Sequence, residues 1–293
     1  MDSWELSLRA EQKAAGTVRT YTAGVRLFLK WCDLTGTPAE LTKSTAQQWL
    51  VHLGEGGAES ATVYARYKSL KHFARWLVDE DELGSNPLEG LKPPRVTVKV
   101  TSPLGEDDML ALLSTCRSKS FVDRRDDAIL RLLFETGLRA SEAIALTLDD
   151  VDLKRGILTV HKGKGGKGRI VPFSPQVGAS IDRYLRLRRS HRLANTPALW
   201  LGGGGKTFGY HGLDGALKRR AEVVGLEQLS VQRLHTHLFR HSAASRWLSK
   251  GGSEQGAMST FGWSNRQMLD RYTAATTAER AIAEAKRLDL GKL

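Results

Sequence analysis

The stretch Thr136-Gly137-Leu138-Arg139-Ala140-Ser141-Glu142 joins two predicted helices of this 293-residue chain. Gly137 interrupts the apolar helical pattern of residues 121–135, and the pattern resumes over 138–146 with Arg139 near its start. A second arginine, Arg240, lies in His237-Leu238-Phe239-Arg240-His241-Ser242. His237 and Arg240 are three residues apart, so they share one face of a predicted helix. Planar, permanently charged guanidinium groups suit the recognition of a phosphate, so the two arginines are candidate phosphate ligands.

Two further stretches carry residue types used in nucleophilic and acid–base chemistry. Phe261-Gly262-Trp263-Ser264 is followed by Asp270-Arg271-Tyr272-Thr273. Between the two arginine stretches, strands predicted over 157–160 and 169–173 flank the tip Lys162-Gly163-Lys164-Gly165-Gly166-Lys167-Gly168. The pattern predicts a β-hairpin with lysines at its tip.

These four elements resemble, in order and in spacing, the tyrosine recombinase (phage integrase) family. The N-terminal helical segment also resembles that family's core-binding domain, so the resemblance covers essentially the whole chain. We expect a compact form without an arm-binding domain, because residues 1–16 are too short for one. The resemblance implies site-specific cleavage and rejoining of duplex DNA through a covalent 3′-phosphotyrosine, with strand exchange through a Holliday junction. It implies the catalytic set Arg139, Lys164, His237, Arg240, Trp263 and Tyr272, with Glu142 in a supporting role.

The chemistry of a phosphodiester supports these roles. The transition state spreads negative charge over the non-bridging oxygens, and each preorganised donor to such charge typically contributes ~10²–10³ in rate. The phenol of Tyr272 has an ordinary pKa of about 10, so it needs a positive field or a base to act as a nucleophile. Arg139, Arg240 and His237 would supply both.

The hairpin lysine is the residue to which the resemblance assigns protonation of the leaving 5′-oxygen. Lys164 is the match, and Lys162 and Lys167 stay open as alternatives or as DNA contacts. Trp263 stands where many family members have histidine; its indole donates one hydrogen bond but cannot shuttle protons. Proton transfer would then depend on Lys164 and His237.

No metal or other cofactor is expected. A phosphotyrosine conserves the energy of the broken bond, so rejoining requires neither ATP nor a metal. His237 and His241 have the spacing of a zinc-binding helix, but the stretch lacks the glutamate of the metalloprotease motif and a third ligand.

The net charge of +12 is unevenly distributed and favours a nucleic-acid partner. Residues 1–95 hold 12 basic and 12 acidic side chains, so the whole excess falls in 96–293. Prolines and glycines between 84 and 103 mark a linker. We therefore predict a helical core-type DNA-binding domain over 1–95 and a catalytic domain over 96–293 that ends in a C-terminal helix.

The predicted fold class is α+β and mainly α, with a small β-hairpin sheet in the catalytic domain. Helices are predicted over 18–32, 44–53, 60–79, 105–116, 121–135, 138–146, 175–190, 210–224, 236–250 and 277–288. Thr17 is the predicted N-cap of the first helix. Lys68, Lys71 and Arg75 share a face of the helix over 60–79, which is either a solvated surface or a set of phosphate contacts.

The chain is expected to work in the cytoplasm of a bacterial cell, on DNA. It shows no signal-peptide pattern at Met1–Glu5, no apolar run of membrane-spanning length, and only two distant cysteines, Cys32 and Cys116. The expected partners are duplex DNA with core-type attachment sites, three further copies of the chain in a homotetramer, and an accessory directionality factor. Integration and excision of a phage or mobile element is the favoured role. Xer-like resolution of chromosome or plasmid dimers, a type IB topoisomerase and a catalytically silent DNA-binding protein are the alternatives.

Overall fold

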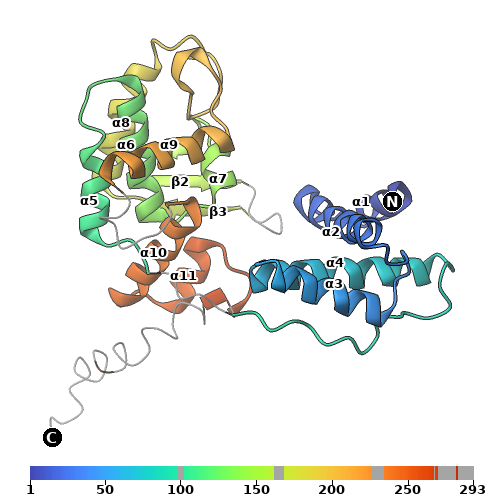
Figure 1. Cartoon of the computed structure of the whole chain (residues 1–293). Helices are drawn as coiled ribbons and strands as arrows, with labels where there is room; N and C mark the ends of the chain where they lie inside the picture. The colour runs from blue at the N-terminus through green and yellow to red at the C-terminus, as the bar shows by residue number, and fades with distance from the viewer. Residues whose placement is uncertain (98–101, 162–167, 226–233, 267, 270–281, 283–293) are drawn as a thin grey trace, which may run out of the picture. The chain divides into compact units, whose positions relative to one another are not determined.

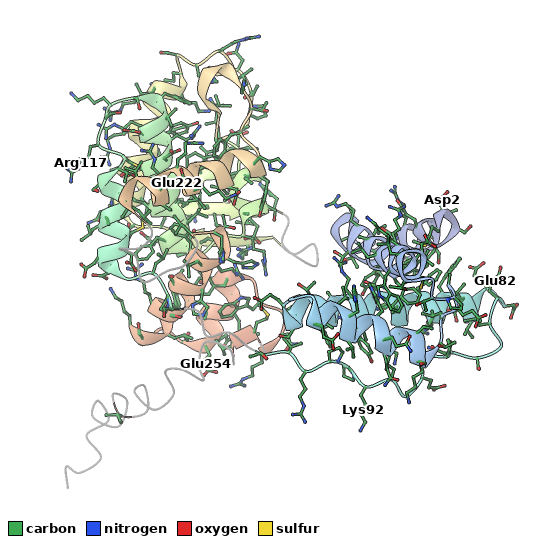
Figure 2. All side chains as sticks on the ribbon, viewed as in Figure 1. Asp2, Glu82, Lys92, Arg117, Glu222 and Glu254 are labelled. Carbon is green, nitrogen blue, oxygen red and sulfur yellow. The ribbon has the colours of Figure 1, made fainter. Side chains whose placement is uncertain are left out.

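The computed structural model describes residues 1–97, 102–161, 168–225, 234–266, 268, 269 and 282. The chain divides into two compact units, Met1–Val100 and Thr101–Leu293 (Figure 1). Both are built mainly from helices, and the second also holds a small antiparallel sheet. The predicted α+β, mainly α fold class is confirmed. Charged side chains such as Asp2 and Lys92 in the first unit, and Arg117 and Glu222 in the second, point outward from the ribbon (Figure 2).

The first unit packs four helices around an aromatic core. These are α1 (Asp2–Ala10), α2 (Ala15–Thr35), α3 (Lys43–Glu55) and α4 (Ser60–Asp79). Trp4 and Trp49 are almost fully buried, and Phe28 meets Trp49 edge to face with ring centroids 5.4 Å apart. Helix α1 was not predicted. The predicted N-cap Thr17 is wrong, because α2 begins at Ala15 and Ala14 is its N-cap residue.

The second unit packs its helices around a larger aliphatic core. Its helices are α5 (Glu106–Ser114), α6 (Phe121–Thr136), α7 (Ala140–Ala145), α8 (Pro175–Arg188), α9 (Tyr210–Val224), α10 (Thr236–Ser249) and α11 (Glu254–Phe261), with a short 3-10 turn η1 (Gly203–Gly205). Helix α6 is flanked by both α8 and α10. The predicted helix over 277–288 lies outside the described residues, apart from Ile282.

The sheet has the order β1-β2-β3 and is antiparallel throughout. Its strands are β1 (Val151–Asp152), β2 (Ile157–Val160) and β3 (Arg169–Pro172). Val160 pairs with Arg169, so the ends of β2 and β3 flank the lysine-bearing tip, of which residues 162–167 lie outside the described residues. The predicted hairpin strands are present, and β1 extends them into a three-stranded sheet. Strand β3 also lies against α11, which brings its first residue toward the end of that helix.

Candidate active site

One cleft of the second unit gathers four of the predicted catalytic side chains. Its volume is about 900 Å³. Arg139, His237, Arg240 and Trp263 all contribute to its wall. The other lining residues are Ala140, Ser141, Tyr210, Thr236, Gly262, Ser264, Asn265 and Met268. The four side chains come from three segments, namely the start of α7, the first turns of α10 and the loop after α11.

Arg139 is placed by the sharp turn between α6 and α7. Gly137 ends α6 in the left-handed conformation, with φ of 59°. A Cβ atom there would lie 2.9 Å from Cε1 of Phe261 and 3.0 Å from Cβ of Ala243. Glycine is therefore required both by the backbone and by the close approach of α10 and α11. Two residues later, Arg139 is the N-cap residue of α7.

Glu142 fixes the guanidinium of Arg139. The Oε1 atom of Glu142 accepts a hydrogen bond of 2.8 Å from Nη1 of Arg139, and Oε2 accepts one of 2.9 Å from the Arg139 backbone N–H. Nη2 of Arg139 donates to the carbonyl oxygen of Gly262 at 3.2 Å. The Arg139 side chain is 24% exposed, so it is both held from behind and open to the cleft.

Arg240 is the more buried of the two arginines. Its Nη1 donates to the Gly137 carbonyl oxygen at 2.9 Å, and its Nη2 donates to the carbonyl oxygen of Phe261. Its guanidinium carbon lies 5.8 Å from the ring centroid of Phe261 and 5.7 Å from that of Trp263. A buried cation held by carbonyl oxygens and ring faces keeps its charge without water. Arg240 therefore offers a fixed positive charge at the floor of the cleft.

His237 lies in the first turn of α10 and is exposed. The preceding His235 caps this helix, since its Nδ1 accepts a hydrogen bond of 3.2 Å from the backbone N–H of Leu238. One turn separates His237 from Arg240, and both side chains reach the cleft. His241 lies on the same helix but is half-buried, and burial lowers the pKa of its imidazole.

Trp263 follows the end of α11. Gly262 terminates that helix in the left-handed conformation, with φ of 61°. The Trp263 ring then packs on Phe261 with centroids 5.0 Å apart, and the residue is 5% exposed. Buried packing at the cleft wall agrees with a shaping role and leaves proton transfer to other residues.

Sequence reasoning missed Arg169, the first residue of β3. Its Nη1 and Nη2 donate to Oε1 and Oε2 of Glu142 at 2.9 and 2.8 Å, and its Nε donates to the carbonyl oxygen of Thr260 at 2.8 Å. Burial raises the pKa of the Glu142 carboxyl, but hydrogen bonds from Arg169 and Arg139 outweigh it and lower that pKa to about 2. Glu142 is therefore an ionised carboxylate between two guanidiniums. Nothing in the sequence singles out Arg169 from the many other arginines.

Several predicted residues are not brought into this site by the described structure. Lys162, Lys164, Lys167 and Tyr272 lie outside the described residues. Lys68, Lys71 and Arg75 lie on α4 in the first unit. There the ammonium groups of Lys68 and Lys71 lie 5.7 and 6.0 Å from the ring centroids of Tyr64 and Tyr67, and Arg75 lies 3.8 Å from Asp79.

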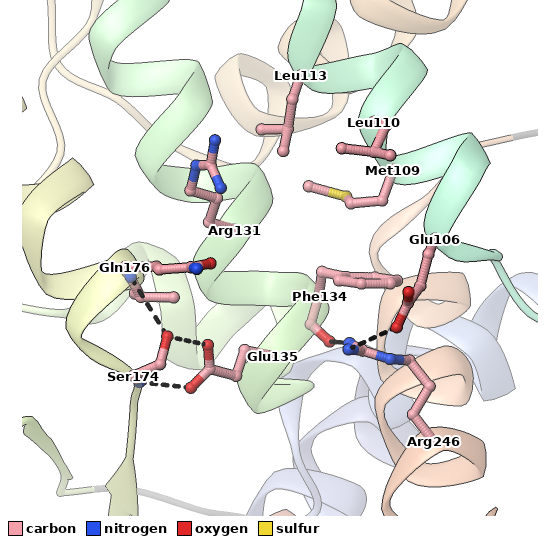
Figure 3. Close-up of a pocket in the computed structure, with 11 residues that line it drawn as sticks. Glu106, Met109, Leu110, Leu113, Arg131, Phe134, Glu135, Ser174, Gln176 and Arg246 are labelled. Carbon is pink, nitrogen blue, oxygen red and sulfur yellow. Dashed lines mark hydrogen bonds and ion pairs between the residues drawn. The ribbon is translucent and has the colours of Figure 1, made fainter.

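A second pocket of the second unit, of about 250 Å³, lies among α5, α6, α8 and α10 (Figure 3). Glu135 accepts hydrogen bonds from the backbone and hydroxyl of Ser174 there, and Arg246 lies 3.8 Å from Glu106. None of the predicted site residues lines it. The cleft with the two arginines is therefore the candidate active site.

Within the described part of the chain, no group of three or more His, Cys, Asp or Glu side chains could hold a metal ion. None of the helices described there has the length and apolar character needed to cross a bilayer.

Comparison with known families identifies the class of protein. Residues 103–279 match the phage integrase family, and residues 1–82 match the N-terminal SAM-like domain of phage integrases. The chain therefore belongs to the phage integrase family and is a tyrosine recombinase, an enzyme of site-specific DNA recombination. The family resemblance predicted from the four sequence elements is confirmed, and with it the enzyme class.

Individual relatives cover most of the chain. The XerC tyrosine recombinase of Chromobacterium violaceum is 35% identical over 88% of this chain and 84% of its own length. The XerA tyrosine recombinase of Thermococcus kodakarensis is 29% identical over all of this chain and 96% of its own.

Solved structures share the fold at lower identity. The Tn1549 transposon integrase in complex with transposon right-end DNA superposes with a TM-score of 0.78, covering 96% of both chains at 19% identity. A lambda integrase dimer bound to a core site gives a TM-score of 0.72 at 16% identity, covering 92% of this chain and 75% of that chain.

Proposed function

We propose that this recombinase cleaves and rejoins duplex DNA through Tyr272, in the cleft that holds Arg139, His237, Arg240 and Trp263. The observation that carries the proposal is the convergence of two guanidiniums and an imidazole, from three separate segments, on one open cleft. Ser264, Asn265 and Met268 also line the cleft, and Met268 is only four residues before Tyr272 in the sequence.

The reaction is a transesterification at phosphorus. The Tyr272 oxygen attacks the scissile phosphate, the bond to the 5′-oxygen breaks, and a 3′-phosphotyrosine forms. His237 accepts the phenolic proton, and Lys164 donates a proton to the leaving 5′-oxygen. In the second half of the exchange the 5′-hydroxyl of the other strand attacks the phosphotyrosine, and both protons return. The number of phosphoester bonds is unchanged, so no ATP is consumed.

The arginines stabilise the charge that develops on the non-bridging oxygens. Arg240 is held by two carbonyl oxygens and two ring faces, so little reorganisation is needed when a phosphate arrives. Arg139 is more open, and its side chain donates a hydrogen bond to Glu142, to which we assign a supporting role. The two cations differ in exposure and can meet two different oxygens of one phosphate.

The two structural units suggest that DNA binding and catalysis belong to different parts of the chain. We assign core-type DNA binding to residues 1–95 and catalysis to residues 96–293. In the first part, Lys68, Lys71 and Arg75 would contact DNA phosphates, and in the second Lys162 and Lys167 would do so beside the catalytic Lys164. Lys68 and Arg75 are exposed and Lys71 is half-buried on α4, so their charged groups are accessible to DNA phosphates.

Strand exchange between two duplexes requires several protomers. We propose a homotetramer on two core-type sites, exchanging strands in pairs through a Holliday junction, with an accessory factor setting direction. We propose that this work takes place on DNA in the cytoplasm of a bacterial cell. The structurally similar lambda integrase was solved as a dimer on a core site, which supports assembly of protomers on DNA.

Integration and excision of a mobile element is the biological role we propose first, and the similarity to the Tn1549 integrase supports it. Xer-like resolution of chromosome or plasmid dimers is a second candidate, because XerC and XerA recombinases match over most of the chain. Deleting the gene separates them. Accumulation of chromosome or plasmid dimers in the deletion strain supports the Xer-like role. Loss of element excision with normal dimer levels supports integration and excision of a mobile element.

The biochemical test uses supercoiled plasmids carrying no, one or two candidate core sites. Recombination that requires two sites and passes through a Holliday junction supports the proposal. A type IB topoisomerase would instead relax plasmids that carry no site, without exchanging strands. Relaxation without recombination on every plasmid would contradict the proposed function.

A further inference from the structure

Glu142 is fully engaged by two arginines. Each of its carboxylate oxygens accepts one hydrogen bond from the Arg139 residue and one from the Arg169 guanidinium, at distances of 2.8 to 2.9 Å. Its side chain is 2% exposed, so water does not complete its coordination. The orientation of Glu142 is therefore determined by both arginines together, and Arg139 depends on a carboxylate that Arg169 also holds.

Arg169 itself is largely buried and does not line the cleft. Its side chain is 9% exposed against 24% for Arg139, and of these two arginines only Arg139 lines the cleft. Its Nε donates a further hydrogen bond to the carbonyl oxygen of Thr260, near the end of α11. It also lies against Gly262, where a Cβ atom would approach its Nη1 to 3.1 Å. Arg169 thus joins the base of the β2–β3 hairpin, Glu142 and the segment that leads to Trp263.

The charges of this trio do not cancel. One carboxylate lies between two guanidiniums, so one positive charge is left over. If Arg139 were paired with Glu142 alone, the carboxylate would neutralise the cation that must attract a phosphate. With Arg169 on the opposite side of Glu142, the carboxylate can orient Arg139 while the cluster keeps a net positive charge facing the cleft.

We propose that Arg169 is a positioning residue of the recombination site, which holds Glu142 and offsets its charge so that Arg139 stays correctly oriented and cationic toward the scissile phosphate. The proposal rests on the proposed function, because it assumes that Arg139 binds that phosphate. It predicts that Arg169 affects the cleavage rate through Glu142, so substitutions of both residues test it.

The test measures the single-turnover rate of covalent adduct formation by the full chain on a nicked suicide substrate. Arg169→Gln is expected to lower this rate roughly 10²-fold, the cost of a misplaced catalytic group, with DNA affinity unchanged in a gel shift. Arg169→Lys keeps the positive charge but loses the bidentate contact with Glu142, so its cleavage rate should lie between those of the wild type and Arg169→Gln. The double variant Glu142→Gln/Arg169→Gln should cleave faster than Arg169→Gln alone, because Arg139 is no longer neutralised. A merely structural role would make the double variant slower still, which would overturn the proposal.

Arg220→Gln is the matched control. Arg220 is another largely buried arginine, 11% exposed and bound to the carboxylates of Asp123 and Asp126, and it does not line the cleft. At equal loss of thermal stability, Arg220→Gln should retain the wild-type cleavage rate. An equal loss of rate in both variants would mean that Arg169 acts only through stability.

A modified substrate identifies the group through which Arg169 acts. A 5′-bridging phosphorothiolate has a sulfur leaving group that needs no proton, so it bypasses the hairpin lysine. The defect of Arg169→Gln should persist on this substrate. Restoration of the wild-type rate would show that Arg169 serves the lysine instead, and would refute the proposal.

The wild-type protein distinguishes failure of the proposed function from failure of the role of Arg169. If the wild type forms no adduct, the proposed function is refuted. If the wild type forms an adduct and Arg169→Gln is unimpaired, only the role of Arg169 is refuted.

Discussion

The guanidinium of Arg240 donates a 2.9 Å hydrogen bond to the carbonyl oxygen of Gly137, a residue 103 positions earlier in the chain. Gly137 ends the helix that precedes Arg139, and Arg240 lies on α10. The bond therefore connects the two segments that supply the arginine pair. The spacing of the pair depends on a turn that only glycine can form without strain.

Gly137→Ala should disrupt this connection. The new methyl group would lie about 3 Å from atoms of Phe261 and Ala243, so close that these neighbours must move. The left-handed backbone at this position would add conformational strain. Gly36→Ala is the control, because Gly36 has φ of 66° and nothing within 4 Å of the added atom. Gly36→Ala should cost about 1 kcal/mol of unfolding free energy and leave cleavage intact. Gly137→Ala should cost more and also slow adduct formation. Equal losses of stability in the two variants, with equal cleavage, would refute this account of the turn.

Arg240→Lys should separate binding from chemistry. One ammonium cannot satisfy the carbonyl oxygens of Gly137 and Phe261 and also bind a phosphate oxygen as a planar guanidinium does. The cleavage rate should fall about 10²–10³-fold, measured by adduct formation, while gel-shift affinity is retained. Arg131→Lys, at an arginine paired with Asp127 outside the cleft, should cleave normally. Cleavage that falls only in proportion to lost binding would contradict the role of Arg240.

Glu142→Gln should make the free energy of unfolding less dependent on pH in the acid range. The pKa of Glu142 is lowered to about 2 in the folded chain, against about 4.3 for an unperturbed glutamate. Its ionised form therefore stabilises the fold above pH ~4.3, on the order of 3 kcal/mol, and this contribution is lost as the pH falls toward 2. Unfolding free energies from pH 7 to pH 2.5 should show the wild type well above Glu142→Gln at neutral pH and the two converging in acid. A constant difference across this range would show that Glu142 is not the titrating group.

The basic face of α4 should appear in the salt dependence of DNA binding. Each phosphate contact adds about 0.9 to the slope of log affinity against log salt. Replacing Lys68, Lys71 and Arg75 with alanine should reduce that slope by up to about 3 if all three bind phosphates. Arg9→Ala is the comparison, since Arg9 is an exposed arginine paired with Glu5 on α1. A slope unchanged by the triple substitution would identify the face as a solvated surface.

Periodicity was sufficient for most helices but not for the shorter elements. The helix over 60–79 was predicted with the observed bounds because its apolar residues recur at helical spacing. Helix α11 was missed because Glu254–Phe261 is only 8 residues long and contains Gly256, Ser259 and Thr260, which are weak helix formers. It is stabilised instead by the local Ser253 cap and by burial of Ala257 and Phe261, and this burial is a tertiary effect.

The site shows the same division between local and distant information. Arg139, His237, Arg240 and Trp263 lie in recognisable motifs, so sequence could nominate them, and the structure places all four at one cleft. Arg169 could not be nominated, because its partner Glu142 is 27 residues away and the contact exists only after β3 has packed beside α11. Tyr210, which is 60% exposed and lines the cleft, lies in none of the recognised motifs, so its place at the cleft is seen only in the folded structure.

The central claim is that Tyr272 is the nucleophile, and the most direct measurement is the covalent adduct itself. A nicked suicide substrate that carries the core site is incubated with the wild type, with Tyr272→Phe and with Tyr210→Phe, which removes the hydroxyl of a tyrosine that lines the cleft. Denaturing gels detect the adduct, and protease digestion with mass spectrometry identifies the modified residue. We expect an adduct at Tyr272 with the wild type and with Tyr210→Phe, and none with Tyr272→Phe. An adduct that survives in Tyr272→Phe, or that maps to another residue, would contradict the account.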